Sequence, residues 1–377
     1  MNDFPLSGRS GRWRPLVLVG CGLGLMLLPL LAAESSARLQ ELLKQYPAAD
    51  TNRDGVLTIE EAQAHAKVLR RGRSGGTTLN DDGTSTPVSK TKKPAPTHAD
   101  VSYGPHERNT LDLWLAKSDA PTPLVVYIHG GGFVNGSKTG VSADMIKGLL
   151  DAGVSIMAIN YRFRSSAPIQ DILRDCARSI QFVRSKATDY NVDPVRIASY
   201  GGSAGAGTSL WLAFHPDLAD PANADPVLRQ SSRIVAAGAI NAQATYKISR
   251  WAEILGNGIV EYERPGETAA FYGAPSVAEL DTPRFEAVRT DVDMLALVSK
   301  DDPPVFLYSS QPDGPVANRG HLLHHPNHAR AVKQACDVAG VPATIGFAMA
   351  KPRLEGDYQE ALRQFLLEAL KAAPPAR

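Results

Sequence analysis

The chain has 377 residues, of which 43% are hydrophobic and 21% are charged. This composition is that of a folded protein with a sizeable apolar core, and the length allows two domains or one large α/β domain with a smaller addition. The formal net charge is +1. A chain so close to neutrality lacks the electrostatic field that draws proteins to nucleic acids or anionic membranes, so we expect neither as a partner.

The N-terminus has the pattern of a secretory signal peptide over residues 1–33. Three arginines precede an apolar run from Pro15 to Ala33, which holds no charged residue and ends in small residues. Such a pattern predicts cleavage after Ala33 and export to the periplasm or the medium, with no membrane span in the mature protein. Two alternatives are a retained anchor, since the run approaches the ~20 residues that a bilayer needs, and lipidation at Cys21.

Residues 34–70 are expected to form a small helical unit around a calcium-binding loop. The segment from Asp50 to Glu61 matches the 12-residue EF-hand loop at its diagnostic positions, with Gly55 at the sharp turn. The expected Ca²⁺ ligands are Asp50, Asn52, Asp54, Val56 through its carbonyl, Thr58 and Glu61. A polar turn before an acidic helix start is the alternative. Because calcium sensors usually pair two hands, a single hand favours a structural role.

Residues 71–97 are rich in glycine, threonine and lysine and show no apolar periodicity, so they indicate a flexible linker. From residue 98 to 374, short apolar runs alternate with helical patterns. This alternation predicts an α/β domain with a mostly parallel sheet and helices on both faces. The expected strands are 99–103, 110–115, 124–128, 155–159, 196–200, 234–240, 305–308 and 344–348. The expected helices include 169–186, 327–339 and 358–370.

Residues 242–300 interrupt this alternation and are expected to cover the site as a cap or lid. The mature chain would keep two cysteines, Cys176 and Cys336. Both fall in predicted helices that are well separated in such a fold. Export would permit a disulfide, but we expect two buried thiols.

Two glycine-rich motifs follow separate predicted strands. Gly201-Gly202-Ser203-Ala204-Gly205 has the G-x-S-x-G pattern of a nucleophile elbow, which predicts Ser203 as a catalytic nucleophile. The run of three glycines after His129 places backbone N–H groups where a reacting carbonyl would lie. We expect an oxyanion hole made by Gly131, Gly132 and Ala204. This chemistry needs no cofactor.

Residues 98–374 resemble the hormone-sensitive-lipase-like and BD-FAE-like esterases of the α/β-hydrolase superfamily. The motifs that carry the resemblance are Arg108–Trp114, His129–Phe133, Asn160–Arg162, Asp193–Ile197, Gly201–Gly205 and Asp302–Val305. The resemblance implies ester hydrolysis through an acyl-enzyme, with small acyl esters or acetylated carbohydrates as substrates. It also implies that Asp313 is the triad acid and that a histidine stands in the segment 348–357, which contains none.

A serine hydroxyl is a poor nucleophile without a base, so two hypotheses follow. The first is a displaced base, with His324 and His325 preferred among a cluster that also holds His321 and His328. In that case Glu355 or Asp357 would replace Asp313 in orienting the base, while His129 would brace the oxyanion loop. The second hypothesis is a catalytically degenerate protein that uses the pocket to bind a carbohydrate or a surface.

Overall fold

The computed structural model describes Leu39, Leu43 and residues 49–50, 54–58, 61, 77–79, 85–87, 91–256, 259, 262 and 264–373. The predicted signal peptide and the expected calcium ligand Asn52 lie outside the described residues. The chain divides into two compact units, Met1–Thr78 and Leu79–Arg377. The segment predicted to be a linker contains two short strands, β1 (Thr77–Leu79) and β2 (Ser85–Pro87).

An eight-stranded sheet forms the centre of the second unit, in the order β10-β9-β8-β7-β5-β6-β4-β3. The strands from β10 to β6 are parallel, β4 pairs antiparallel with β6, and β3 pairs antiparallel with β4. Their bounds are β3 (His98–Ser102), β4 (Thr110–Trp114), β5 (Thr122–Ile128), β6 (Ser155–Ile159), β7 (Val192–Gly202), β8 (Ala237–Ile240), β9 (Val305–Ser309) and β10 (Ala343–Phe347). The predicted mostly parallel sheet is confirmed.

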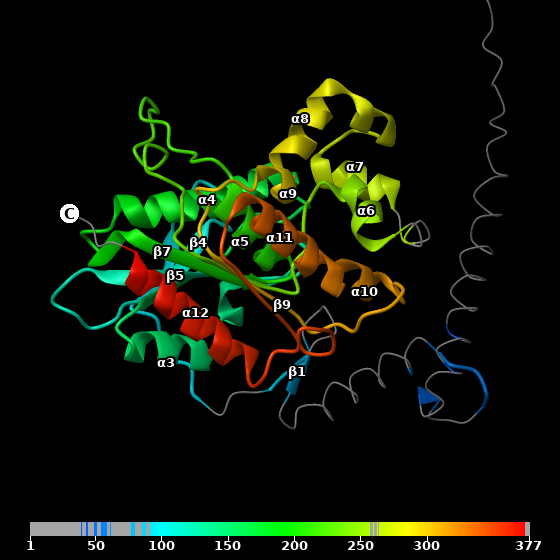
Figure 1. The fold of residues 1–377 in the computed structure, drawn as a ribbon, viewed down its shortest axis with the longest axis horizontal. Helices are drawn as coiled ribbons and strands as arrows, with labels where there is room; N and C mark the ends of the chain where they lie inside the picture. Colours follow the sequence, from blue (N-terminus) through cyan, green and yellow to red (C-terminus); the bar gives the residue numbers. More distant parts are fainter. Residues whose placement is uncertain are drawn as a thin grey trace, which may run out of the picture. The chain divides into compact units, whose positions relative to one another are not determined.

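Helices cover both faces of this sheet (Figure 1). One face carries α4 (Ile169–Ser185), α5 (Ala204–Phe214) and α11 (Pro326–Ala339), and the other carries α3 (Ala143–Asp151) and α12 (Tyr358–Ala372). Because side chains alternate along a strand, Leu124 and Val126 of β5 enter the first core, whereas Val125 enters the second. Cys176 and Cys336 are free thiols buried in the first core.

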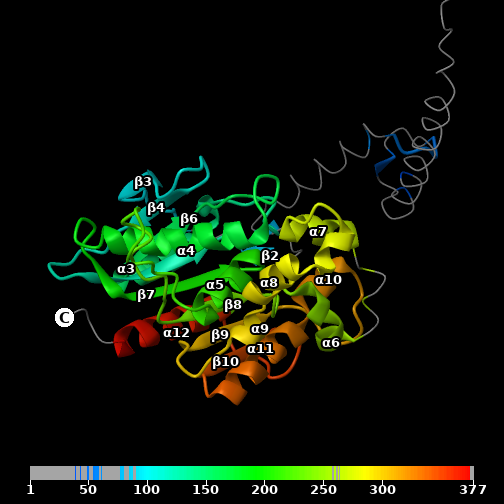
Figure 2. The ribbon, with the colours of Figure 1, turned by 90° about the horizontal axis from the view of Figure 1, so that it is seen from above.

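Several short helices lie between β8 and β9. They are η3 (Ile248–Arg250), α6 (Trp251–Leu255), α7 (Pro265–Tyr272), η5 (Val277–Asp281), α8 (Pro283–Asp291) and α9 (Met294–Leu297). Figures 1 and 2 place α6 and α7 at the same end of the sheet as α10 (Arg319–His324), which follows β9. This is the segment in which a cap is predicted, and that role stays a prediction.

The register of the central strands brings distant segments to one edge. Ile128 at the end of β5 lies opposite Gly201 of β7, and Ile240 at the end of β8 lies opposite Gly202. The loops that leave β5 and β7 therefore emerge side by side, where parallel α/β sheets place their sites. Within the described parts of the chain, no helix is long and apolar enough to cross a bilayer.

Candidate active site

The turn from β7 into α5 holds Ser203 in a strained conformation, with φ 51° and ψ −117°. A non-glycine residue in this region costs of order 1–3 kcal/mol and persists only where its surroundings enforce it. Side chains at Gly201 or Gly205 would collide with the carbonyl oxygen of Ile128 at the end of β5. The close approach of these two backbones explains why glycines flank the serine at both positions.

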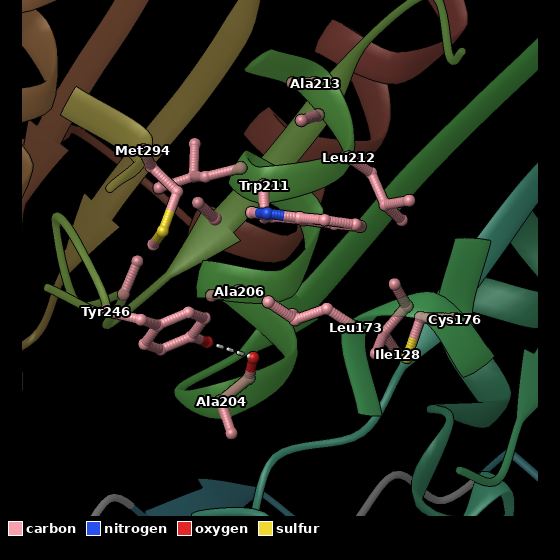
Figure 3. Close-up of a cluster of buried hydrophobic side chains, with 14 of the residues drawn as sticks. Ile128, Leu173, Cys176, Ala204, Ala206, Trp211, Leu212, Ala213, Tyr246 and Met294 are labelled. Atoms are coloured by element: carbon pink, nitrogen blue, oxygen red, sulfur yellow. Dashed lines mark hydrogen bonds between the residues drawn. The ribbon is translucent and has the colours of Figure 1, made fainter. Parts of the chain in front are cut away.

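Hydrogen bonds from neighbouring elements hold this turn in place. The Ser203 N–H donates to the carbonyl of Ile240 at 2.8 Å. The hydroxyls of Tyr246 and Thr208 both donate to the Ala204 carbonyl at 2.8 Å. Figure 3 shows the Tyr246 contact beside Trp211 of α5 and Met294 of α9, which belong to the same apolar core. The strained turn thus rests on a packed apolar core.

The loop after β5 presents the predicted oxyanion donors. Gly131 and Gly132 have φ values of 100° and 59°, and a Cβ at Gly131 would collide with Asn135. In residues 91–256 and 264–373, the N–H groups of Gly131, Gly132 and Ala204 form no backbone hydrogen bond. The Ala204 N–H also lies in the first turn of α5, where the helix dipole favours negative charge. These three groups are available to an oxyanion.

His129 packs beneath this loop. Its ring stacks on Tyr161 at a centroid distance of 4.1 Å, and its Nδ1 donates to the Gly130 carbonyl at 2.7 Å. The Tyr161 hydroxyl donates to the His129 carbonyl at 2.6 Å. Burial lowers the pKa of His129 to about 4, so the imidazole is neutral and rigid. These contacts fit the brace expected from the sequence.

His324 lies against the nucleophile. Its Nε2 is 2.8 Å from the Ser203 Oγ, and the residue is the last of α10. The Asn318 side chain caps α10 by accepting from the His321 N–H at 2.9 Å. The Ser309 hydroxyl, at the end of β9, donates to the His324 carbonyl at 2.9 Å. The short helix is therefore fixed at both ends, and it directs one imidazole at Ser203.

The other three histidines of the cluster face backbone groups. The Nδ1 atoms of His321, His325 and His328 accept from the N–H groups of Ala317, Asn327 and Ala244. Their Nε2 atoms lie 2.9–3.0 Å from the carbonyls of Pro312, Gly314 and Leu322. An Nδ1 that accepts a hydrogen bond leaves the ring proton on Nε2. Both nitrogens of each of these three rings therefore already have a hydrogen-bond partner in the backbone.

The structure separates the two preferred histidines. His325 is the N-cap of α11, with φ −56° and ψ 139°, and its ring does not contact Ser203. The reason lies in the next residue, Pro326, because a residue before proline is excluded from the helical region. His324 therefore ends one helix and His325 begins the next, and the two side chains point to different places.

Asp313 lies in the loop after β9, as the family pattern implies, and is paired there with Arg330. Both of its oxygens are bound by the Arg330 guanidinium, at 2.5 and 3.0 Å. This hydrogen bonding holds the pKa of Asp313 below its usual value. Asp357, one of the two alternative acids, accepts from the Gln359 N–H and caps α12. Each of these two carboxylates has a structural partner other than His324.

Ser203 and His324 open into a cavity of about 910 Å³. The lining includes the oxyanion loop and four tyrosines, Tyr127, Tyr200, Tyr308 and Tyr358. No Asp, Glu, Lys or Arg occurs among the described residues that line it. The cavity therefore suits an uncharged ligand, because a charged group away from the oxyanion N–H groups would lose its hydration without gaining a charged partner among the described residues.

Two tyrosines support the site, and no role was predicted for either of them from the sequence. Tyr161 follows β6, and Tyr246 follows β8, so both come from the edge at which the site forms. Neither belongs to a local motif that would assign it a role, since their contacts arise from the packing of segments distant in the chain. Tyr161 lies just after an expected strand and within the Asn160–Arg162 motif, so of the two tyrosines it alone carries an indication in the sequence.

In the first unit, the structure describes Asp50, residues 54–58 and Glu61 of the expected calcium loop. The Gly55 N–H donates to Asp50 Oδ2 at 2.9 Å, and Gly55 has a φ of 81°. The Thr58 hydroxyl donates to Glu61 Oε2 at 2.8 Å, while the Glu61 N–H donates back to that hydroxyl at 3.1 Å. In the described residues no three His, Cys, Asp or Glu side chains converge as metal ligands do.

The mostly parallel sheet and the serine turn between β7 and α5 define an α/β-hydrolase fold. The chain belongs to the BD-FAE family, whose profile matches residues 111–325, more than half of the sequence. Among solved structures it is similar to a carbohydrate esterase from gut microbiota, with a TM-score of 0.57, 20% identity and coverage of 73% of this chain and 96% of that one. Esterase B from Lactobacillus rhamnosis aligns with a TM-score of 0.53 and 16% identity over 83% of this chain and 94% of that one. These two likenesses show the fold.

Curated relatives match over shorter segments. A probable isoprenylcysteine alpha-carbonyl methylesterase of Arabidopsis thaliana is 32% identical over 36% of this chain and 28% of its own length. A probable carboxylic ester hydrolase of Mycobacterium tuberculosis (strain ATCC 25618 / H37Rv) is 29% identical over 55% of this chain and 46% of its own length. The chain thus spans less than half the length of either relative.

Proposed function

We propose that this protein is an exported serine ester hydrolase that acts on small acyl esters or acetylated carbohydrates. The observation that carries the proposal is the 2.8 Å contact between Ser203 Oγ and His324 Nε2. It supports the hypothesis of a displaced base, because a protein that only binds its ligand has no need of a base at the serine. The names of the relatives, which include a carboxylic ester hydrolase and a carbohydrate esterase, support the substrate class.

In the first half of the reaction, Ser203 Oγ attacks the ester carbonyl carbon while His324 Nε2 takes the hydroxyl proton. The carbonyl π electrons move to the oxygen, which accepts hydrogen bonds from the N–H groups of Gly131, Gly132 and Ala204. The intermediate then collapses to an acyl-serine ester. The alcohol leaves with the proton that His324 returns to its oxygen.

In the second half, a water molecule gives its proton to His324 Nε2 and attacks the acyl carbon. Collapse of this intermediate breaks the bond to Ser203 Oγ, which recovers the proton, and releases a carboxylic acid. Loss of one oxyanion donor typically costs ~3 kcal/mol of transition-state stabilisation, and a general base contributes on the order of 10²- to 10⁴-fold. In the proposed reaction, backbone N–H groups and the His324 imidazole supply these two effects.

Ester hydrolysis by the purified protein tests this proposal. We expect Ser203→Ala to remove the hydrolysis of p-nitrophenyl acetate, because the acyl-enzyme can no longer form. Circular dichroism and thermal melting of the same variant serve as the control for folding. If the wild type shows no Ser203-dependent turnover across a panel of acetyl, propionyl and acetylated-sugar esters, the protein is a binding module on a hydrolase scaffold.

We also propose that the loop from Asp50 to Glu61 binds Ca²⁺ and has a structural role. Oxygen donors alone suit a hard cation, and the Gly55 turn directs its N–H at Asp50, which shapes the loop. The test is titration calorimetry of the full protein with CaCl₂. Glu61→Gln should weaken binding strongly, because Glu61 is the expected bidentate ligand. Equal binding by wild type and variant would contradict the assignment.

A further inference from the structure

Asn241 directly follows β8 and lies close to the nucleophile. The residue before it, Ile240, accepts a hydrogen bond from the Ser203 N–H at 2.8 Å, and Asn241 lines the cavity that contains Ser203 and His324. Asn241 has a φ of 53°. Residues with a side chain seldom adopt this left-handed conformation, although asparagine tolerates it better than most. The fold therefore holds an asparagine in a strained conformation at the catalytic edge of the sheet.

The carboxamide of Asn241 has a fixed orientation. Its Oδ1 accepts from the Ser310 N–H at 2.8 Å and from the Ser310 hydroxyl at 3.2 Å. Because a backbone N–H group can only donate, the oxygen of the carboxamide faces Ser310 and the Nδ2 group faces away from it. Within the described chain, Nδ2 donates to no residue. Asn241 thus has a hydrogen-bond donor that the protein itself does not use.

This donor is accessible from the cavity. Asn241 as a whole is only 4% exposed. Among the described residues, the side-chain atoms that are fully buried without a partner include the Tyr200 hydroxyl but not Asn241 Nδ2. The unpaired Nδ2 therefore keeps accessible surface, and because Asn241 lines the cavity, this surface opens into it. A bound ligand can reach Nδ2 and supply its acceptor.

The strand order places Asn241 on the same side of Ser203 as the base. β5 and β8 flank β7 on opposite sides, so Asn241 lies across Ser203 from the oxyanion loop. His324 follows β9, the strand next to β8. Two consecutive serines after β9 hold both residues, since Ser309 Oγ donates to the His324 carbonyl and the Ser310 N–H donates to Asn241.

The chemistry at Ser203 determines which part of a substrate lies on this side. In the tetrahedral intermediate, the oxyanion points to the N–H groups of the loop after β5 and of Ala204. The leaving oxygen must lie beside His324 Nε2, because that atom protonates it. The alcohol group that carries the leaving oxygen therefore occupies the part of the cavity next to Asn241.

We propose that Asn241 is a specificity-determining residue, whose Nδ2 donates a hydrogen bond to a neutral oxygen on the alcohol group of the ester. This inference rests on the proposed ester hydrolysis at Ser203. No Asp, Glu, Lys or Arg occurs in the described lining, which favours an uncharged alcohol. The preferred alcohols carry an ether or hydroxyl oxygen close to the ester oxygen, and plain alkyl alcohols of the same length are poorer substrates.

Two acetate esters with matched alcohols test the inference. 2-Methoxyethyl acetate and butyl acetate have alcohol chains of the same length and differ by one oxygen in place of a methylene. The ether oxygen can only accept a hydrogen bond, so it requires a donor. We define the alcohol preference as kcat/KM for the methoxyethyl ester divided by kcat/KM for the butyl ester, measured from acetic acid release. Intrinsic reactivities cancel when this ratio is compared between variants.

The main variant is Asn241→Asp, which keeps an oxygen for the Ser310 N–H but replaces the donor with a second oxygen. Aspartate also tolerates a positive φ. We expect the alcohol preference to fall at least about fivefold, as for the loss of one neutral hydrogen bond. Asn241→Gly suits the same backbone conformation and should lower the ratio without adding a charge. It also tests the inference if Asn241→Asp does not fold.

The matched control is Asn191→Asp, because Asn191 also has a positive φ, of 50°, but lies outside the cavity lining. This variant should keep the wild-type ratio. An unchanged ratio in the Asn241 variants, with Ser203-dependent hydrolysis intact, overturns the role of Asn241 while the enzyme assignment stands. Absence of Ser203-dependent hydrolysis of both esters by the wild type overturns both.

Discussion

The loops that follow β9 and β10 leave the sheet side by side, yet they differ in chemistry. The segment after β9 contains α10 and the start of α11, and it holds four buried histidines. The loop after β10 carries no histidine and presents Met349, which is 66% exposed, at the cavity. Parallel strands end at the same edge, so a base can reach Ser203 from either loop. Under the proposed function, the comparison teaches that the base can come from either loop at this edge of the sheet, and not from the loop after β10 alone.

The largest expected effect concerns the base itself. His324→Ala should lower kcat/KM for p-nitrophenyl acetate on the order of 10²- to 10⁴-fold, because the Ser203 proton loses its acceptor. The matched control is His325→Asn, since asparagine also caps helices well, and it should stay within about twofold of wild type. The reverse result, with His325→Asn inactive and His324→Ala active, would move the base to the neighbouring residue.

The second effect concerns the pH dependence of stability and arises from His328, whose buried ring bonds to two backbone groups. Burial lowers its pKa to about 3, whereas the unfolded imidazole titrates near 6.5. Between these values the unfolded state binds more protons, so stability is complete above pH 6.5 and falls as the pH decreases. From pH 7 to pH 5 this residue should account for about 2 kcal/mol of lost unfolding free energy.

Urea denaturation of wild type and His328→Gln at the two pH values measures this contribution. Glutamine offers a donor and an acceptor but does not titrate, so the variant should lose less stability on acidification. An identical loss in both proteins would show that His328 accepts its proton without unfolding. The buried His328 ring would then not account for the loss of stability at low pH.

A third effect concerns the tie between β9 and α10. Ser309→Ala removes the hydroxyl that donates to the His324 carbonyl and should cost about 1 kcal/mol of stability. Because the tie positions His324, kcat should fall several-fold while KM changes little. Thermal melting and steady-state kinetics measure the two quantities. A loss of stability with unaltered kcat would show that α10 keeps its place without this bond.

The smallest effect is expected at Asp313. Asp313→Asn breaks an ion pair whose carboxylate side chain is 49% exposed, and exposed pairs contribute about 0–1 kcal/mol. Hydrolysis should continue at close to the wild-type rate, because Arg330 rather than His324 holds this carboxylate. Steady-state kinetics with p-nitrophenyl acetate check it. A drop of a hundredfold or more would restore Asp313 as the acid of the triad.

Local sequence determined the elbow and the oxyanion loop. A backbone carbonyl of β5 passes too close to Gly201 and Gly205 for any side chain, and such a requirement leaves glycines at fixed spacing. The hydrophobic alternation likewise predicted each strand of the eight-stranded sheet, with shifts of a few residues at the ends.

The histidine at Ser203 was not determined in the same way. The sequence indicates four candidates within eight residues, and their ring directions depend on where α10 ends. That end is set by Pro326, which forces His325 out of the helix, and the pattern His-His-Pro contains this information. The partner of Asp313 had no such signal, because Arg330 reaches it from α11, beyond α10.

The uncharged lining of the cavity bears on the end of the catalytic cycle. Hydrolysis turns a neutral ester into an acid that ionises at neutral pH, and the described lining offers no cation to hold it. A newly formed carboxylate gains more from water than from this wall. Under the proposed reaction, product inhibition should be weak. The negative charge that each turnover creates on the product favours its release into water, which leaves the site open to the next ester.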